Sequence, residues 1–157
     1  MTKQSAGILL FRFRNQHLEF FLVHPGGPFF THKDTGAWSI PKGEFSEEEQ
    51  PLDAAKREFK EELGADASGK FIALTPIKQK GGKLVYAWAL EGDINAEEIK
   101  SNLFELEWPP KSGKKKEFPE IDKAAWFTIE AARQKINPAQ AALIDEILAK
   151  LHYTEGH

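Results

Sequence analysis

Residues 43–65 read GEFSEEEQPLDAAKREFKEELGA, and this stretch decides how the rest of the chain is interpreted. Three carboxylates, Glu58, Glu61 and Glu62, lie within five residues at the end of a predicted helix. A helix C-terminus carries partial negative charge, and glutamates at positions i and i+4 repel each other on one helix face. Such a cluster becomes favourable around a hard divalent cation, and Mg²⁺ often joins protein carboxylates to substrate phosphates. The stretch therefore predicts a carboxylate–metal site and phosphate chemistry.

The same stretch predicts where its helix begins and ends. Ser46 and Glu49 have the spacing of a capping box, and proline is tolerated only in a first turn, so the helix begins between residues 47 and 51. Gly64 suits the left-handed position that ends a helix. Apolar residues at helical spacing predict one buried stripe, made of Leu52, Ala55, Phe59 and Leu63. The three glutamates fall largely off that stripe and can face a cleft.

The segments on both sides predict strands and further helices. Upstream, residues 6–14 and 18–24 predict a hairpin. Downstream, residues 71–78 and 83–90 predict two strands joined at Gly81-Gly82. The remaining segments predict a short helix at 96–102, a lysine-rich loop at 108–116, a strand at 124–128, and helices at 129–136 and 139–151, the last one capped by Asn137. We expect one domain over residues 1–157, arranged as an α/β/α sandwich.

The composition of the whole chain narrows the function. It has 21 Lys and Arg against 24 Asp and Glu, a net charge of −3, which argues against duplex nucleic acid or a membrane as partner. There is no cysteine, so disulfides and thiolate metal sites are excluded. No secretion signal or membrane-spanning stretch is recognisable. The default expectation is a cytoplasmic enzyme, monomeric or homodimeric, with a small-molecule substrate.

The stretch 43–65 resembles the signature box of the Nudix hydrolases. That box reads Gly, five residues, Glu, seven residues, then Arg-Glu-apolar-x-Glu-Glu-x-Gly-apolar, and all nine defined positions match. The early hairpin, the Pro41-Lys42-Gly43 entry to the box and Trp126-Phe127 resemble the family too. The resemblance implies a Nudix-type α/β/α sandwich with a mixed β-sheet. It also implies hydrolysis of a nucleoside diphosphate linked to another group.

The resemblance implies a metal-binding role for four residues. Glu58 and Glu62 resemble the direct ligands of the family, and Glu61 resembles a ligand that acts directly or through a water. The backbone carbonyl of Lys42 resembles the main-chain ligand. The implied cofactor is Mg²⁺, with Mn²⁺ as an alternative.

Three further residues of the box are expected to support this site. Glu49 resembles the residue that orients the carboxylates, and Gly43 lets the loop approach the helix closely. Arg57 is interpreted as a structural ion-pair partner. The competing interpretation is that Arg57 and Glu61, at i and i+4, form only a solvated salt bridge, which explains neither Gly43 nor the crowding of acids.

Outside the box, one carboxylate is a candidate base or further metal ligand. In many relatives a glutamate six residues before a tryptophan has this role, and here that position is Glu120, with Glu117 as the competitor. The proton of the attacking water would pass to Glu58, Glu61 or Glu120.

Candidate substrate contacts are lysines and an aromatic residue. Lys42, Lys114, Lys115 and Lys116 are candidates to bind a polyphosphate as point charges, although such a run also suits a soluble loop. Tyr86 lies two residues from Trp88 on a predicted strand face and is a candidate to stack on a base, or simply to belong to the core.

Substrate choice is assigned by resemblance alone. SAGILLFR, LEFFLVH and AWSIPKGE resemble the diadenosine polyphosphate hydrolase branch, so a dinucleoside polyphosphate is the preferred substrate. The alternatives are a house-cleaning pyrophosphatase for oxidised nucleoside triphosphates, an ADP-ribose or nucleotide-sugar pyrophosphatase, and a non-catalytic nucleotide sensor.

Overall fold

The eleven-residue strand β1 (Gln4–Arg14) organises the fold because it pairs with three other strands. It turns through Asn15 and Gln16, both at positive φ, into the antiparallel strand β2 (His17–Pro25). It also pairs with β6 (Leu84–Glu91) in parallel and with β3 (Lys42–Glu44) in antiparallel orientation. The sheet is therefore mixed, as expected.

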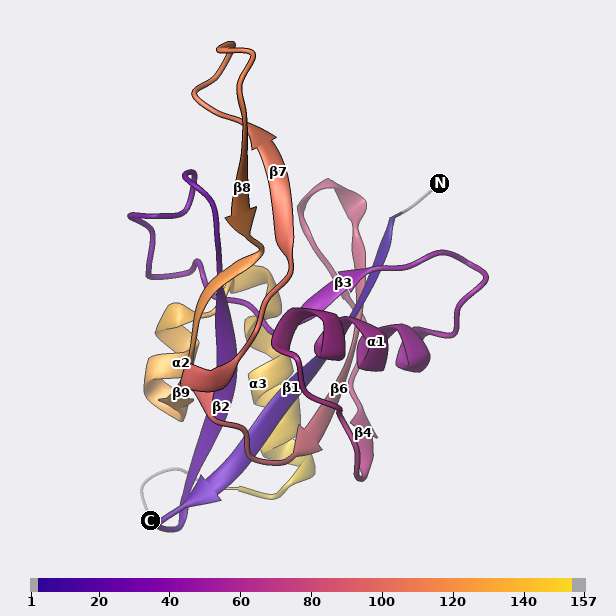
Figure 1. Ribbon diagram of the computed structural model, residues 1–157. Helices are drawn as coiled ribbons and strands as arrows, with labels where there is room; N and C mark the ends of the chain where they lie inside the picture. The colour runs from indigo at the N-terminus through magenta and orange to yellow at the C-terminus, as the bar shows by residue number, and fades with distance from the viewer. Residues whose placement is uncertain (1–2, 154–157) are drawn as a thin grey trace.

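A computed structural model describes residues 3–153, and the outer ends of the predicted domain, 1–2 and 154–157, lie outside the described residues. The main sheet runs β4-β6-β1-β2-β9, with β3 beside β1 and β5 beside β6 (Figure 1). The remaining elements are β4 (Phe71–Ala73), β5 (Ile77–Lys78), β7 (Leu103–Glu107), β8 (Lys115–Pro119), β9 (Ile121–Thr128), α1 (Pro51–Leu63), α2 (Ile129–Lys135), α3 (Ala141–Lys150) and the 3₁₀ turns Lys80–Gly82, Ala96–Glu98 and Pro138–Gln140.

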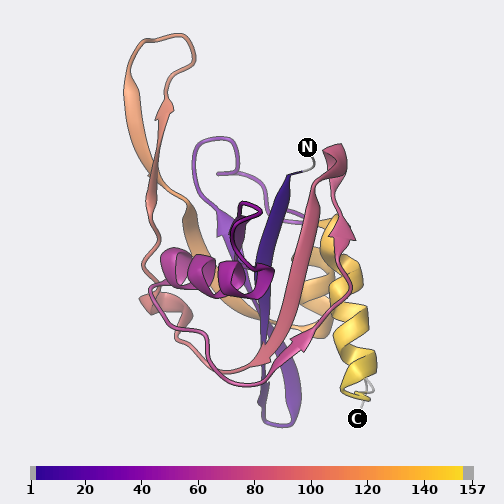
Figure 2. The same ribbon diagram turned by 90° about the vertical axis from the view of Figure 1, so that its right-hand side faces the viewer.

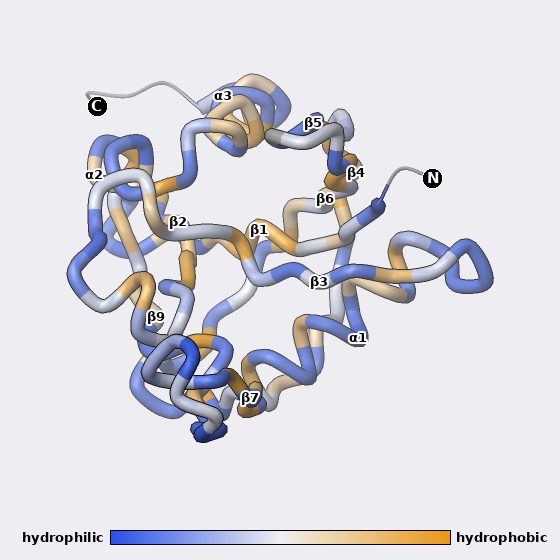
Figure 3. The backbone as a smooth tube through the Cα atoms, turned by 90° about the horizontal axis from the view of Figure 1, so that it is seen from above, coloured by the Kyte–Doolittle hydropathy of each residue, from blue (hydrophilic) through white to orange (hydrophobic). Residues whose placement is uncertain are grey.

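Helices cover both faces of the sheet, which confirms the α/β/α sandwich. Helix α1 lies on one face, and α2 and α3 lie on the other (Figure 3). Side chains of β1 alternate between the two layers, since Ile8 and Leu10 pack with α1 while Leu9 and Phe11 pack with α2 and α3. Each such buried side chain stabilises the fold by roughly 1.5–3 kcal/mol. Among residues 3–153, no helix is both long and apolar enough to cross a membrane.

Helix α1 begins at the last residue of the predicted range 47–51, but without the predicted capping box. Its N-cap is Gln50, without a side-chain cap, and Pro51 is the first helical residue. Ser46 and Glu49 form a turn before the helix, and the carboxylate of Glu49 is bound by Arg57 instead. The capping-box prediction was wrong because Pro51 can occupy only the first turn. Gly64 ends the helix at φ 75°, as predicted.

The loop predicted at 108–116 is confirmed over residues 108–114, where it connects the two strands of a hairpin. Strands β7 and β8 pair in a separate two-stranded sheet, so Lys115 and Lys116 lie on a strand and not in a loop. This hairpin, here called the arm (residues 103–119), rises from the body of the protein (Figures 1 and 2). Lys115 and Lys116 were predicted in the loop because the pairing partner of β8 is distant in sequence: at the base of the hairpin Leu103 lies opposite Pro119, sixteen residues away.

Other predicted elements are shorter or divided. Residues 71–78 form two short strands, because Pro76 cannot donate to the ladder and Thr75 binds Glu146 of α3 through its N–H (2.7 Å). The helix predicted at 96–102 is only the turn Ala96–Glu98. Asn137 caps a 3₁₀ turn, and α3 itself starts at residue 141.

Candidate active site

Gly43 lies directly against the carboxylate of Glu58. A Cβ at position 43 would lie 2.0 Å from Glu58 Cδ and 2.1 and 2.2 Å from its two oxygens. Strand β3 can therefore approach α1 this closely only because residue 43 has no side chain. This close approach brings the backbone of β3 next to the carboxylates of α1.

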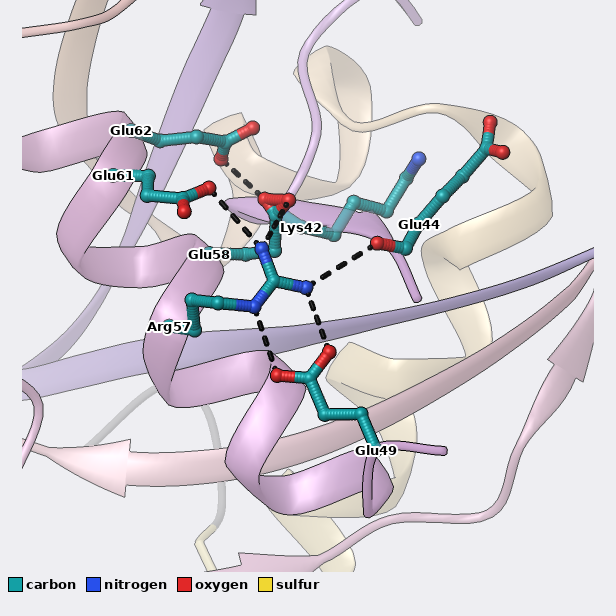
Figure 4. A network of polar contacts seen from close by, with 7 residues as sticks. All are labelled: Lys42, Glu44, Glu49, Arg57, Glu58, Glu61 and Glu62. Atoms are coloured by element: carbon teal, nitrogen blue, oxygen red, sulfur yellow. Dashed lines mark hydrogen bonds and ion pairs between the residues drawn. The ribbon is translucent and has the colours of Figure 1, made fainter. Parts of the chain in front are cut away.

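Arg57 links the turn before the helix to the carboxylate cluster (Figure 4). Its Nε and Nη2 each donate to Glu49 at 2.8 Å, a bidentate pair. Its Nη1 donates to Glu58 (3.3 Å) and to Glu61 (3.2 Å), and Nη2 reaches the backbone oxygen of Glu44 at 3.5 Å. The hydrogen bonds that Arg57 donates to Glu49 are the largest cause of the raised pKa of Arg57, and they in turn lower the pKa of Glu49. Arg57 and Glu49 thus fix the position of the carboxylates of α1 relative to β3 and to the turn before the helix.

Glu62 is bound to the backbone of β3. Its Oε2 accepts the N–H of Lys42 at 3.0 Å. In an antiparallel ladder, the N–H and C=O of a residue that does not bond across the pair both point away from the partner strand. Lys42 lies opposite Gly7, and its N–H donates to Glu62 and not to β1. Lys42 and Gly7 therefore form a pair without hydrogen bonds across the ladder. The carbonyl of Lys42 thus points to the same edge of β3 as its N–H, on the side of α1.

The carboxylates carry more negative charge than their partners offset. Burial, first, and then the charges of Glu58 and Glu120 raise the pKa of Glu62 to about 8. The pKa of Glu58 is also raised, first by burial, with Glu61 and Glu120 adding to the effect and Arg57 opposing it. Three carboxylates from two separate segments therefore repel one another at this point.

A divalent cation fits this charge distribution. Within residues 3–153 no group of three or more acidic or histidine side chains is arranged to hold a metal ion. Oxygens of Glu58 and Glu61 accept hydrogen bonds from Arg57, and an oxygen of Glu62 accepts the N–H of Lys42. The donor set consists of oxygen atoms, which hard cations prefer. A cation there would relieve the repulsion that raises the pKa values of Glu58 and Glu62. Divalent-cation chemistry is thus compatible with the residues present.

The structure brings Glu120 to the cluster from a distant part of the sequence. Its backbone is anchored at the junction of β8 and β9, where its N–H donates to the Asn102 carbonyl (2.8 Å) and its carbonyl accepts the N–H of Gly26 (2.9 Å). Its charge acts on both Glu58 and Glu62. Glu117 is exposed on the arm, opposite Glu105. Glu120 is thus the candidate whose charge acts on the carboxylates of the box, and its role as base or ligand stays a prediction.

The predicted lysines lie at two different places. The side chain of Lys42 is half-buried beside the cluster, and burial, first, followed by the charge of Lys83, lowers its pKa. Lys114, Lys115 and Lys116 are exposed on the arm. Lys115 Nζ lies 3.4 Å from Glu105 Oε1, whereas Lys116 Nζ lies 5.7 Å from the centre of the Phe118 ring.

Tyr86 is half-buried in the layer of α1. Its hydroxyl accepts a hydrogen bond from Gln4 Nε2 (3.3 Å), and Phe45 meets its ring edge-on with centroids 6.0 Å apart. Gln4 and Phe45 also line a cavity of about 480 Å³ next to the turn before α1. Tyr86 therefore supports the wall of a cavity and does not stand free on a strand face.

Two contributors to the site were missed by the sequence interpretation. Lys83 binds the carboxylate of Glu44 (3.3 Å) and places a second cation near Lys42. Gln140 is fully buried; its Oε1 accepts the N–H of Ile40 (3.0 Å) and its Nε2 donates to Ser39 Oγ (3.0 Å). Gln140 thus holds the segment that leads into Lys42. No local sequence signal marks either residue, because Lys83 acts on Glu44, 39 positions away, and Gln140 acts on Ser39, 101 positions away.

Comparisons with known proteins point to one family and one fold. A family model described as the NUDIX domain matches residues 1–147. Among solved structures, a C. elegans Ap4A hydrolase is similar at 22% identity and a TM-score of 0.64, and the match covers 96% of this chain and 98% of that one. The NUDIX domain of Shewanella oneidensis NrtR, complexed with ADP ribose, has 14% identity and a TM-score of 0.64, and the match covers 96% of this chain and 89% of that one. A mutT/nudix family protein from Listeria innocua has 14% identity and a TM-score of 0.61, and the match covers 96% of this chain and 94% of that one. A search of the curated proteins gave no significant match.

Proposed function

Since this chain belongs to the NUDIX domain family and is a pyrophosphohydrolase of substrates that contain a nucleoside diphosphate linked to another group, we propose that it cleaves a phosphoanhydride bond of a dinucleoside polyphosphate. Mg²⁺, with Mn²⁺ as the alternative, is the proposed cofactor. The observation that carries the proposal is the meeting of Glu58, Glu62 and Glu120 beside the backbone of β3, next to the cations Lys42 and Lys83. The same proposal includes a cytoplasmic location and a monomer or homodimer.

The residues of the cluster have distinct roles in this proposal. Glu58, Glu61, Glu62 and the carbonyl of Lys42 would hold the metal, with Glu120 as a further ligand or base. When bound, the metal supplies charge neutralisation at the phosphates and acidifies a water. Glu49, Arg57 and Gly43 keep the ligands in place.

The chain's own carboxylates accept the proton of the attacking water. Glu120, or one of Glu58 and Glu61, takes that proton as the water oxygen bonds to phosphorus. The bond from phosphorus to the bridging oxygen breaks, and the leaving phosphate keeps the electron pair. The side chains of Lys42 and Lys83 hold phosphate oxygens as point charges. The products are a nucleotide and a phosphorylated remainder.

Two features support a dinucleoside polyphosphate over the other substrates. The chain is 22% identical to the protein described as an Ap4A hydrolase and 14% identical to the domain complexed with ADP ribose, at equal TM-scores of 0.64. In addition, the basic arm supplies cationic side chains well beyond the carboxylate cluster, which suits a long phosphate chain.

A substrate panel with Mg²⁺ tests the proposal. It should contain diadenosine polyphosphates, canonical and oxidised nucleoside triphosphates, ADP-ribose and nucleotide sugars, with kcat/KM measured for each. We expect the highest kcat/KM for a diadenosine polyphosphate, and products from ¹⁸O-labelled water would identify the attacked phosphorus. A higher value for ADP-ribose or an oxidised triphosphate would transfer the assignment to that class. Absence of metal-dependent turnover for all of them would favour a nucleotide sensor.

A further inference from the structure

The arm has two chemically different faces. Its register pairs Phe104 with Phe118 and Leu106 with Lys116, and a hydrogen bond from Trp108 N to Lys114 O (2.9 Å) extends the ladder by one pair. Because side chains alternate along strands, one side of the arm, here called the aromatic–basic face, is formed by Phe104, Leu106, Trp108, Lys114, Lys116 and Phe118. The opposite side carries Glu105, Glu107 and Glu117, together with Lys115, which pairs with Glu105.

The aromatic–basic face is turned toward the loop that follows β2. A Cβ on Gly27 would lie 2.9 Å from Phe104 Cζ, and the rings of Phe29 and Trp108 meet nearly at right angles with centroids 5.5 Å apart. Figures 1 and 2 both show the loop and the arm rising side by side. Phe29 remains 58% exposed despite this contact. Phe104, Trp108 and Phe118 are only half-buried, and none of these four aromatic residues belongs to either hydrophobic core of the domain.

This face continues from the carboxylate cluster. Gly26, at the start of the loop, donates its N–H to the carbonyl of Glu120 (2.9 Å). At about 3.3 Å per residue along a strand, Lys116 lies about 13 Å and Lys114 about 20 Å from Glu120. That span suits a chain of several phosphates between two nucleosides, and it exceeds what one nucleotide bound at the cluster would need.

We propose that the aromatic–basic face and Phe29 bind the second nucleoside of a dinucleoside polyphosphate, the one that lies farther from the carboxylates. The indole of Trp108 stacks on its base, and Phe29, whose ring is nearly perpendicular to that indole, contacts the base at its edge. Lys114 and Lys116 hold the phosphate chain that leads to it. This inference rests on the proposed function and adds the element that selects substrates with two nucleosides. Stacking suits any base, because every base has a π face. Lys115 is left out, since its charge is paired on the opposite side.

Direct binding tests the inference without turnover. The full chain with Mg²⁺ is titrated with a methylene-bridged diadenosine tetraphosphate analogue in a calorimeter. Trp108→Ala should raise Kd by about 5- to 100-fold, the range of base–aromatic stacking, and Trp108→Phe should restore most of the affinity. The double variant Lys114→Ala/Lys116→Ala should also raise Kd, by less at high salt, because exposed charges are screened beyond about 8 Å.

Matched controls make the test specific. Lys115→Ala, on the same arm but the opposite face, should change Kd by no more than about two-fold, as expected for an exposed ion pair. A methylene-bridged nucleoside triphosphate, which has one base, should bind the wild type and Trp108→Ala equally. Thermal denaturation confirms that each variant folds.

Defined outcomes overturn the inference. An unchanged Kd in Trp108→Ala, an equal effect of Lys115→Ala, an equal loss for the one-base ligand, or no binding of the analogue by the wild type would each do so. Tighter binding of a single-stranded oligonucleotide that is lost in Trp108→Ala would also overturn it, in favour of a nucleic-acid end. Turnover by the wild type is decided separately. A wild type that binds the analogue through Trp108 but hydrolyses no dinucleoside polyphosphate would contradict the proposed function and leave the binding site standing.

Discussion

Replacing Gly43 with alanine should separate the geometry of the site from the stability of the fold. The new Cβ would lie 2.0 Å from Glu58 Cδ, whereas ordinary contact begins near 3.4 Å. The carboxylate must therefore move by about 1.4 Å, which changes a side-chain rotamer at a cost of roughly 0.5–1.5 kcal/mol. The obstacle is the end of a flexible side chain, so the core and the backbone pairing of β3 should remain.

The expected consequence is a large loss of rate in a folded protein. A displacement of about 1 Å at a reacting group can lower the rate by on the order of 10²-fold. We therefore expect Gly43→Ala to reduce kcat by about 100-fold or more at saturating Mg²⁺, with a Tm within a few degrees of the wild type. Steady-state turnover of the best substrate and thermal denaturation measure the two effects.

Gly7→Ala is the matched control. Its Cβ would lie 2.5 Å from the backbone oxygen of Pro41 and 2.6 Å from Lys42 Cβ, and backbone cannot move as a side-chain end can. This variant should lose stability, in contrast to Gly43→Ala. The reasoning would be refuted if Gly43→Ala kept a near-wild-type kcat, or if it unfolded as readily as Gly7→Ala.

Three further predictions follow from the cluster. Glu58→Gln and Glu62→Gln should each lower kcat by on the order of 10²–10⁴, a loss of roughly 3–5 kcal/mol of transition-state stabilisation; a near-wild-type rate at saturating Mg²⁺ would contradict the ligand assignment. Glu120→Gln should lower kcat more than Glu117→Gln; the reverse order would give the role to Glu117, and small equal effects would place the base on α1. In the folded protein the pKa of Glu62 is raised from 4.5 to about 8, so the fold favours the protonated carboxyl. The contribution of this group to the free energy of unfolding is fully present below pH 4.5 and is lost as the pH rises to 8. Without divalent cation, Tm should therefore fall between pH 5 and 8, and Mg²⁺ should recover more Tm at pH 8 than at pH 5; equal Tm values with chelator at both pH values would contradict this.

Some features of the site were predictable because they are encoded locally. The end of α1 at Gly64 depends on the backbone freedom of one residue. The placement of Glu58 and Glu62 on one side of α1 follows from the helical repeat. Gly43 was expected to permit close approach, and it does so against Glu58 itself. By contrast, the capping box at Ser46 failed although it is also local, because a second local constraint, Pro51, and a more favourable partner for Glu49 competed with it.

The sequence by itself therefore determined the helix, the spacing of the carboxylates along it and the mixed α/β/α class. Only the tertiary structure decided that Glu120 joins them from 58 positions beyond Glu62, that Lys83 stands beside Lys42, and that Lys114 and Lys115 of one basic run lie on opposite faces of an arm. The physical reason is the range of the interactions. Caps, turns and i to i+4 contacts depend on residues within a few positions, whereas strand register and loop-to-arm packing depend on which distant segments pair, and a shift by one residue moves every side chain to the other face.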